Sequence, residues 1–200
     1  WQALLDRDAD DPVARYHVAL AFHEDGDRAQ AARWYEAQVA RHPATPKAWL
    51  NLGLLRLASR DAEGAVAALR EACGTAPDLA AAWTALGRAL ERAGDAGGAI
   101  DAWTRARSLD PRGLEPLERQ AALLGARAAL PAAIALYREA IALDPRKPSL
   151  RFALAAHLSS LGEHAEALEQ LRVAAGLAPA DADGGSALLF ELQYDDALAS

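Results

Sequence analysis

Apolar and small residues recur along the chain every three or four positions, which is the spacing of one face of an α-helix. Between positions 80 and 93, four residues lie on one such face: Trp83, Leu86, Gly87 and Leu90. Gly94 and Asp95 interrupt the run, since glycine readily ends a helix and aspartate caps the next one. The pattern therefore predicts one helix over 80–93 and a second helix that stops before Pro111.

The same pattern returns every 34 residues. Prolines end successive units at this spacing: Pro43, Pro77, Pro111, Pro145 and Pro179. A ladder of alanines keeps the same step: Ala31, Ala65, Ala99, Ala133 and Ala167. A fixed period of this length is typical of a solenoid, in which each unit buries its apolar face against its neighbours.

The period predicts five helix pairs, at residues 12–45, 46–79, 80–113, 114–147 and 148–181. Residues 1–11 fit the second helix of an incomplete repeat, and residues 182–200 fit a linker followed by a capping or junction helix. Within a pair, Gly53 and Gly87 should let two helices approach closely. We expect large side chains to fill the core between units: Tyr35, Trp49, Trp83, Leu86, Trp103 and Tyr137.

Residues 12–181 resemble the tetratricopeptide repeat (TPR) family. The resemblance is carried by Trp-x-x-Leu-Gly at 83–87 and 49–53, the later alanine, an aromatic residue or leucine in each second helix, and the terminal proline. It implies an all-α fold, a right-handed α-α superhelix (TPR solenoid) of five 34-residue helix pairs with flanking helices. It also implies a concave groove, lined by the first helix of each pair, that holds an extended peptide or helix of a partner protein.

Helical projection of the first helices predicts the residues of this peptide-binding groove. They are Tyr16, His17, Leu20, Lys47, Leu50, Asn51, Leu54, Arg88, Arg92, Arg119 and Phe152. Arg88, Arg92 and Arg119 should converge on one face, where guanidinium groups suit a carboxylate or an acidic peptide. Alternatively, Glu91, Glu115 and Glu118 already pair with them. The leucines of the first two helices are either anchor sites for a ligand or part of the core between helices.

The composition narrows the classes of function. Lys and Arg number 21 and Asp and Glu 28, a formal net charge of -7 that argues against general binding to nucleic acid or to an anionic membrane. No apolar run of about 18 residues is free of charges, so we expect no membrane span. Phosphate loops, paired metal-binding histidines and activated nucleophiles are absent from the sequence. We therefore predict a non-enzymatic, cytoplasmic protein with no cofactor and no metal, in which Cys73 is a core residue.

A second resemblance supplies an alternative function. Residues 186–198, SALLFELQYDDAL, look like the junction between the repeats and the catalytic region of O-linked N-acetylglucosamine transferase-like glycosyltransferases. This implies the substrate-recognition arm of such an enzyme, with the catalytic domain outside this chain. The chain also starts at Trp1 and holds no methionine, from which we expect a longer parent protein. A peptide-binding scaffold and a transferase arm both stay open at this point.

Overall fold

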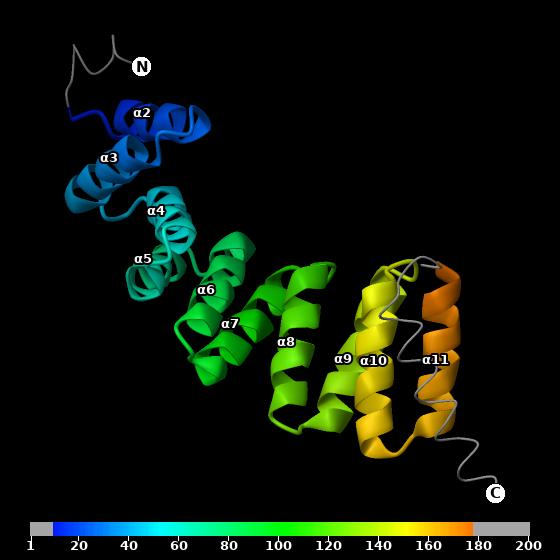
Figure 1. The fold of residues 1–200 in the computed structure, drawn as a ribbon. Helices are drawn as coiled ribbons and strands as arrows, with labels where there is room; N and C mark the ends of the chain where they lie inside the picture. Colours follow the sequence, from blue (N-terminus) through cyan, green and yellow to red (C-terminus); the bar gives the residue numbers. More distant parts are fainter. Residues whose placement is uncertain (1–9, 178–200) are drawn as a thin grey trace, which may run out of the picture. The chain divides into compact units, whose positions relative to one another are not determined.

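The computed structural model describes residues 10–177, and these form helices arranged in antiparallel pairs (Figure 1). The first helices of the pairs are α2 (Pro12–Glu24), α4 (Pro46–Ala58), α6 (Ala80–Arg92), α8 (Leu114–Ala126) and α10 (Pro148–Leu161). The second helices are α3 (Arg28–Arg41), α5 (Ala62–Thr75), α7 (Ala96–Leu109), α9 (Leu130–Leu143) and α11 (His164–Leu177). Both series begin at intervals of 34 residues, and no strand occurs within residues 10–177. The predicted all-α fold of 34-residue helix pairs is confirmed for these residues. The helix predicted within residues 1–11 lies outside them except for residues 10 and 11, and the linker and helix predicted at 182–200 lie outside them entirely.

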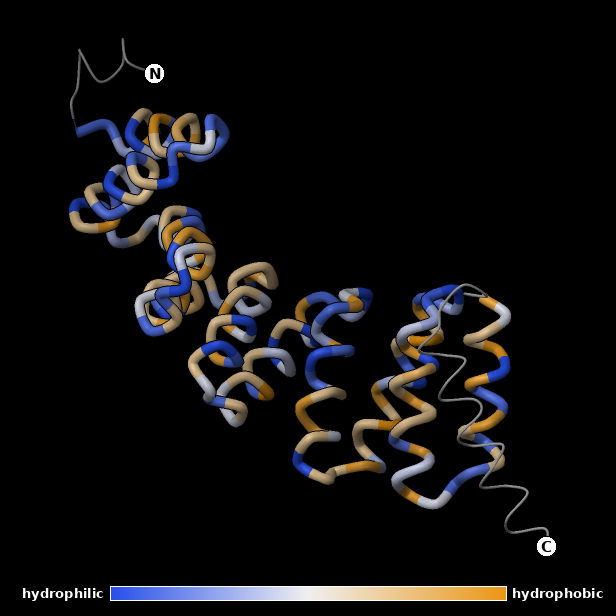
Figure 2. Tube along the Cα trace, in the orientation of Figure 1, coloured by the Kyte–Doolittle hydropathy of each residue, from blue (hydrophilic) through white to orange (hydrophobic). Residues whose placement is uncertain are grey.

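The helices fall into two compact units, residues 1–109 and 110–200. The described part of the first unit holds α2 to α7, and that of the second holds α8 to α11. Inside each unit, the two helices of a pair pack most extensively, and the second helix of one pair packs on the first helix of the next. Apolar and polar positions interleave along every helix (Figure 2), as expected where each helix buries one face and exposes another.

The turn inside each pair contains a residue in the left-handed conformation. Three of these residues are glycines, Gly26, Gly94 and Gly162, with φ of 82°, 80° and 90°. Arg60 and Ala128 occupy the equivalent places in the other two pairs and have φ of 65° and 59°. Because residues with a side chain rarely adopt this conformation, the packing of each helix pair must impose it on these two turns.

Most of the predicted aromatic core is confirmed. Tyr35 and Trp103 are fully buried, and Leu86 and Tyr137 are also buried. The close approach predicted at the glycines is present as well. A Cβ on Gly87 would lie 2.6 Å from the Trp103 ring, and one on Gly53 would lie 2.5 Å from Cγ of Leu69.

Trp49 and Trp83 are less buried than expected: both stay partly exposed, and Trp49 packs against the edge of the buried core. Their indole Nε1 atoms donate hydrogen bonds to the main-chain oxygens of Pro43 and Pro77, at 2.8 and 3.0 Å. Each indole therefore ties the start of a first helix to the proline that ends the preceding unit. If either indole moved into the core, its N–H would lose this acceptor and be buried without a hydrogen-bond partner.

Candidate functional site

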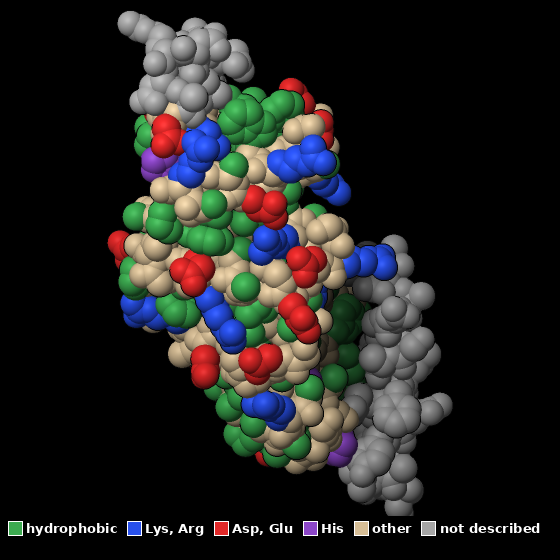
Figure 3. All heavy atoms as spheres, turned by 90° about the vertical axis from the view of Figure 1, so that its left-hand side faces the viewer, with side chains coloured by type: hydrophobic (Ala, Val, Ile, Leu, Met, Phe, Trp, Pro, Cys, Tyr) green, Lys and Arg blue, Asp and Glu red, His purple; other side chains and the backbone are tan. Residues whose placement is uncertain are grey.

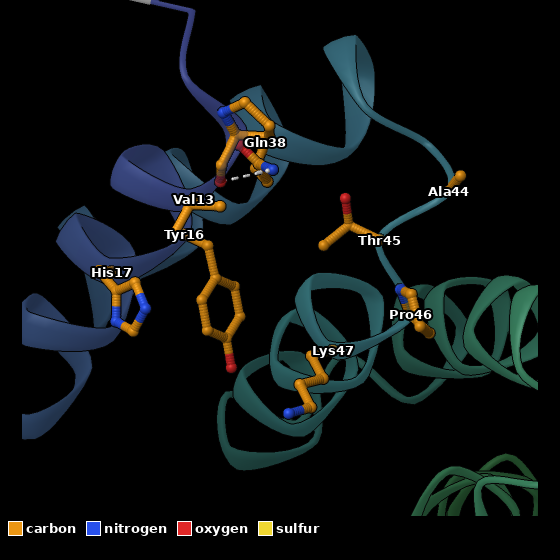
Figure 4. A pocket seen from close by; sticks show the side chains of 9 residues that line it. Val13, Tyr16, His17, Gln38, Ala44, Thr45, Pro46 and Lys47 are labelled. Atoms are coloured by element: carbon orange, nitrogen blue, oxygen red, sulfur yellow. Dashed lines mark hydrogen bonds between the residues drawn. The ribbon is translucent and has the colours of Figure 1, made fainter. Parts of the chain in front are cut away.

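A pocket of about 540 Å³ opens between α2, α3 and the start of α4, within the first unit (Figure 4). It is lined by Pro12, Val13, Tyr16, His17, Gln38, Ala44, Thr45, Pro46 and Lys47. Three of these residues, Tyr16, His17 and Lys47, were predicted as groove residues. In Figure 4 the Tyr16 ring lies between His17 and Lys47. Helical projection thus placed on α2 and α4 three residues that line one pocket, and their role in binding a peptide stays a prediction.

The two helix starts that frame the pocket follow from local sequence. Pro12 and Pro46 each occupy the first position of a helix, where proline has no N–H to satisfy and its φ is already helical. Asp11 caps α2 by accepting from the main-chain nitrogens of Val13 and Ala14, at 2.8 and 3.0 Å. Thr45 holds the loop before α4, since its hydroxyl donates to the main-chain oxygen of His42 at 2.9 Å. The pocket walls are thus set by the capped start of α2 and by the start of α4, whose preceding loop Thr45 holds.

Gln38 is the polar residue behind this pocket. Its side chain is fully buried, and its Nε2 donates to the main-chain oxygen of Pro12 at 3.1 Å. Its Oε1 accepts no hydrogen bond from any residue in the described part of the chain. A buried acceptor without a donor costs about 1–3 kcal/mol.

Sequence reasoning missed Gln38, although a signal was present. The other four repeats carry alanine at the equivalent position of the second helix, and each of these alanines is buried: Ala72, Ala106, Ala140 and Ala174. A glutamine in this ladder of alanines marks the first repeat as different. Gln38 is also one of the residues that line the pocket.

Asn51, a predicted groove residue, links α4 to both helices of the preceding pair. Its Nδ2 donates to the hydroxyl of Tyr35 at 2.9 Å and to the hydroxyl of Tyr16 at 3.3 Å. Burial raises the pKa of Tyr35 to about 12, so this hydroxyl keeps its proton at physiological pH. The amide therefore holds Tyr16 in its orientation at the pocket.

The arginines predicted to bind an acidic ligand have interactions within the chain itself. Arg92 uses its Nη1 to donate to the main-chain oxygen of Leu57 at 2.7 Å, which caps the end of α4. Arg88 and Arg119 also have interactions of their own. Arg119 lies on α8, in the other unit, so the convergence of all three stays a prediction. Among nearby acids, Glu91 accepts from the Trp103 indole at 2.8 Å.

The remaining predicted groove residues lie on first helices, as expected. They are Leu20 on α2, Leu50 and Leu54 on α4, and Phe152 on α10. All four are half-buried, and Phe152 also packs against the apolar core of the second unit. None of the predicted groove residues is fully buried, so each retains surface that a ligand could contact.

The described residues lack the features of two other kinds of site. Residues 10–177 contain no group of three or more His, Cys, Asp or Glu side chains that could hold a metal ion. No helix in that range has the length and apolar character needed to cross a bilayer. On the face shown in Figure 3, acidic and basic side chains are interspersed rather than gathered by sign. Burial raises the pKa of the Cys73 thiol to about 11, as suits a core residue.

Helix pairs that repeat every 34 residues, with a pocket between successive first helices, define a helical-repeat solenoid protein. A family model described as Tetratricopeptide repeat matches residues 24–80 and 50–113. The match covers the middle of the chain and is to the same family that the sequence resembles. The comparison with curated protein sequences gives no match.

Several solved structures share the fold. YrrB, described as a TPR protein with an unusual peptide-binding site, is 14% identical with a TM-score of 0.83, over 98% of this chain and 97% of YrrB. A MamA structure is 19% identical with a TM-score of 0.79, over 83% of this chain and 91% of MamA. TTC0263, a TPR protein of Thermus thermophilus, is 20% identical with a TM-score of 0.57, over 91% of this chain and 99% of TTC0263. At these identities the matches establish the fold.

Proposed function

We propose that the chain is a protein-interaction scaffold that binds an extended peptide or a helix of a partner along α2 and α4. The pocket between these helices carries the proposal, because predicted groove residues from both helices meet there. Its volume of about 540 Å³ lies within the range of about 300–1,000 Å³ typical of ligand sites. YrrB, a protein of the same fold, is described as having a peptide-binding site, which adds support.

The pocket offers two kinds of contact to such a ligand. Pro12, Pro46 and Val13 form apolar walls, and Val13 is 55% exposed, so covering it with an apolar side chain removes hydrocarbon from water. The hydroxyl of Tyr16, a residue that lines the pocket, supplies a polar group for the ligand's main chain, and Asn51 holds that hydroxyl in place. An anchor of this size supports binding of modest affinity, with further contacts from the half-buried leucines of both helices.

Several narrower statements remain part of this proposal. A cytoplasmic location, a non-enzymatic role and a partner other than nucleic acid are what the composition and the sequence pattern favour. The alternative, a substrate-recognition arm of an O-linked N-acetylglucosamine transferase-like glycosyltransferase, would use the same peptide-binding surface. It rests on residues 186–198, which lie outside the described residues, and on a catalytic domain outside this chain.

The proposal is tested with a library of displayed 12-residue peptides selected on the immobilised chain, followed by calorimetric titration of the selected peptides. Val13→Glu places a charge on the exposed pocket wall and should weaken binding at least tenfold. Leu143→Glu is the matched control, because Leu143 is another large apolar residue, 43% exposed, on α9 of the second unit.

Circular dichroism checks that both variants keep their helix content, which exposed positions should allow. If no peptide is enriched, or if both variants weaken binding equally, the pocket is not a peptide-binding site.

A further inference from the structure

The chemistry of the pocket identifies the class of peptide that fits it, an inference that rests on the function proposed above. We propose that the pocket takes an aromatic side chain carrying its own hydrogen-bond donor, tyrosine or tryptophan, from a partner segment in which an acidic residue follows it. Three observations carry this proposal: the apolar walls, the unpaired oxygen behind them, and the charge at the rim.

The walls favour a flat apolar group. Two proline rings, the exposed Val13 side chain and the Tyr16 ring surround the space (Figure 4). Aromatic rings prefer edge-to-face or offset contacts with other rings, and Tyr16 already makes such contacts with His17, at a ring-centroid distance of 5.5 Å. A ligand ring entering beside Tyr16 extends this arrangement.

The unpaired oxygen favours a donor at the tip of that group. Oε1 of Gln38 has no donor among the described residues, while the Nε2 of the same amide is fixed by its bond to the Pro12 oxygen. That bond sets which end of the amide is the acceptor. Because Gln38 is fully buried, only an inserted side chain that displaces part of the pocket wall makes contact with its Oε1, and a ligand's main chain at the pocket mouth does not. Tyrosine and tryptophan fit this requirement, because each has an apolar ring that suits the pocket walls and a donor, the phenol O–H or the indole N–H, that can bond to Oε1.

The rim favours a negative charge next to the aromatic residue. The chain has two lysines, and they differ in their surroundings. Lys147 forms an ion pair with Glu118, whereas Lys47, exposed at the pocket, forms none within the described residues. A carboxylate on the ligand supplies an ion-pair partner for Lys47. None of the arginines predicted to bind an acidic ligand lines this pocket.

The test uses a 12-residue Ser-Gly peptide with one tyrosine followed by two aspartates, titrated calorimetrically into the full chain. Replacing the tyrosine by phenylalanine removes only the donor and should weaken binding about fivefold, the value of one hydrogen bond. Replacing both aspartates by asparagine should weaken it by up to about fivefold and reduce its salt dependence. Both changes are made in the peptide, so the folding of the chain is unaffected.

Variants of the chain then locate each effect. On Gln38→Met the tyrosine and phenylalanine peptides should bind equally, and on Lys47→Gln the aspartate and asparagine peptides should bind equally. Lys147→Gln is the matched control and should behave like the unmodified chain. In the unmodified chain, bound peptide should protect Lys47 but not Lys147 from acetylation, as read by mass spectrometry.

Equal binding of the tyrosine and phenylalanine peptides to the unmodified chain overturns the proposal, and so does protection of Lys147 in place of Lys47. No binding of the Tyr-Asp-Asp peptide, when library-selected peptides do bind, overturns it too. The function proposed above is decided separately, by the library and the Val13→Glu variant.

Discussion

Gly87→Ala tests the packing that holds each helix pair together. The added Cβ would lie 2.6 Å from Cδ2 and Cε2 of Trp103, closer than such contacts allow. The indole cannot retreat easily, because it is fully buried and its Nε1 is bonded to Glu91. Overpacking of this kind costs about 1–3 kcal/mol, while alanine returns up to about 1 kcal/mol of helix propensity. We expect a net loss of about 1–2 kcal/mol in the free energy of unfolding.

The assay is urea unfolding followed by circular dichroism and tryptophan fluorescence. Gly74→Ala is the matched control, since a Cβ there meets nothing within 4 Å, and it should be neutral or stabilising by up to about 1 kcal/mol. Gly53→Ala should fall between them, because its neighbour is the flexible Leu69 side chain. Adding Gly87→Ala to Trp103→Leu should cost less than adding it to the unmodified chain. Equal stability of the Gly87 and Gly74 variants would refute the reasoning.

Two further predictions concern stability. His157 packs edge-to-face on Tyr137, its Nε2 lies against Gly125 without a partner among the described residues, and burial lowers its pKa. The folded state therefore binds fewer protons than the unfolded state, so the free energy of unfolding should fall as the pH drops below the unfolded pKa of about 6.5. His157→Phe should reduce the change in the urea midpoint between pH 7.5 and 5.5, and an unchanged pH dependence contradicts this. Ala128→Gly should raise the thermal midpoint through a gain of about 1 kcal/mol, because Ala128 has φ of 59°; a lower midpoint contradicts the strain argument.

The repeat period predicted the helices well because each level of the chain points to the same structure. Helical spacing and terminal prolines agree at every unit, and aspartates cap the second helix in the first three units. Even Arg60, with no glycine to mark it, adopts the turn conformation of its equivalents. Trp49 and Trp83 were expected to fill the core but stay partly exposed. Their helical spacing is that of a buried face. The spacing does not reveal that each indole N–H donates to the main-chain oxygen of the proline six residues earlier, which keeps the ring at the edge of the core.

The site was predicted in part for a similar reason. Projection onto a helix finds which residues share a face, so Tyr16 and Lys47 could be placed on facing surfaces. It does not find a bond between positions far apart in sequence. Gln38 bonds to Pro12 and Arg92 bonds to Leu57, in each case across a helix boundary, and these contacts decide which polar groups remain for a ligand.

Gln38, which interrupts the ladder of buried alanines, affects how a protein built from similar repeats recognises its partner. An array of equivalent units offers a ligand several similar registers, each one shifted by a repeat. Gln38 breaks that equivalence at one position, with a polar group where the other repeats have only a methyl. A partner that recognises it is held in a single register and direction, which converts a periodic surface into one with a defined starting point.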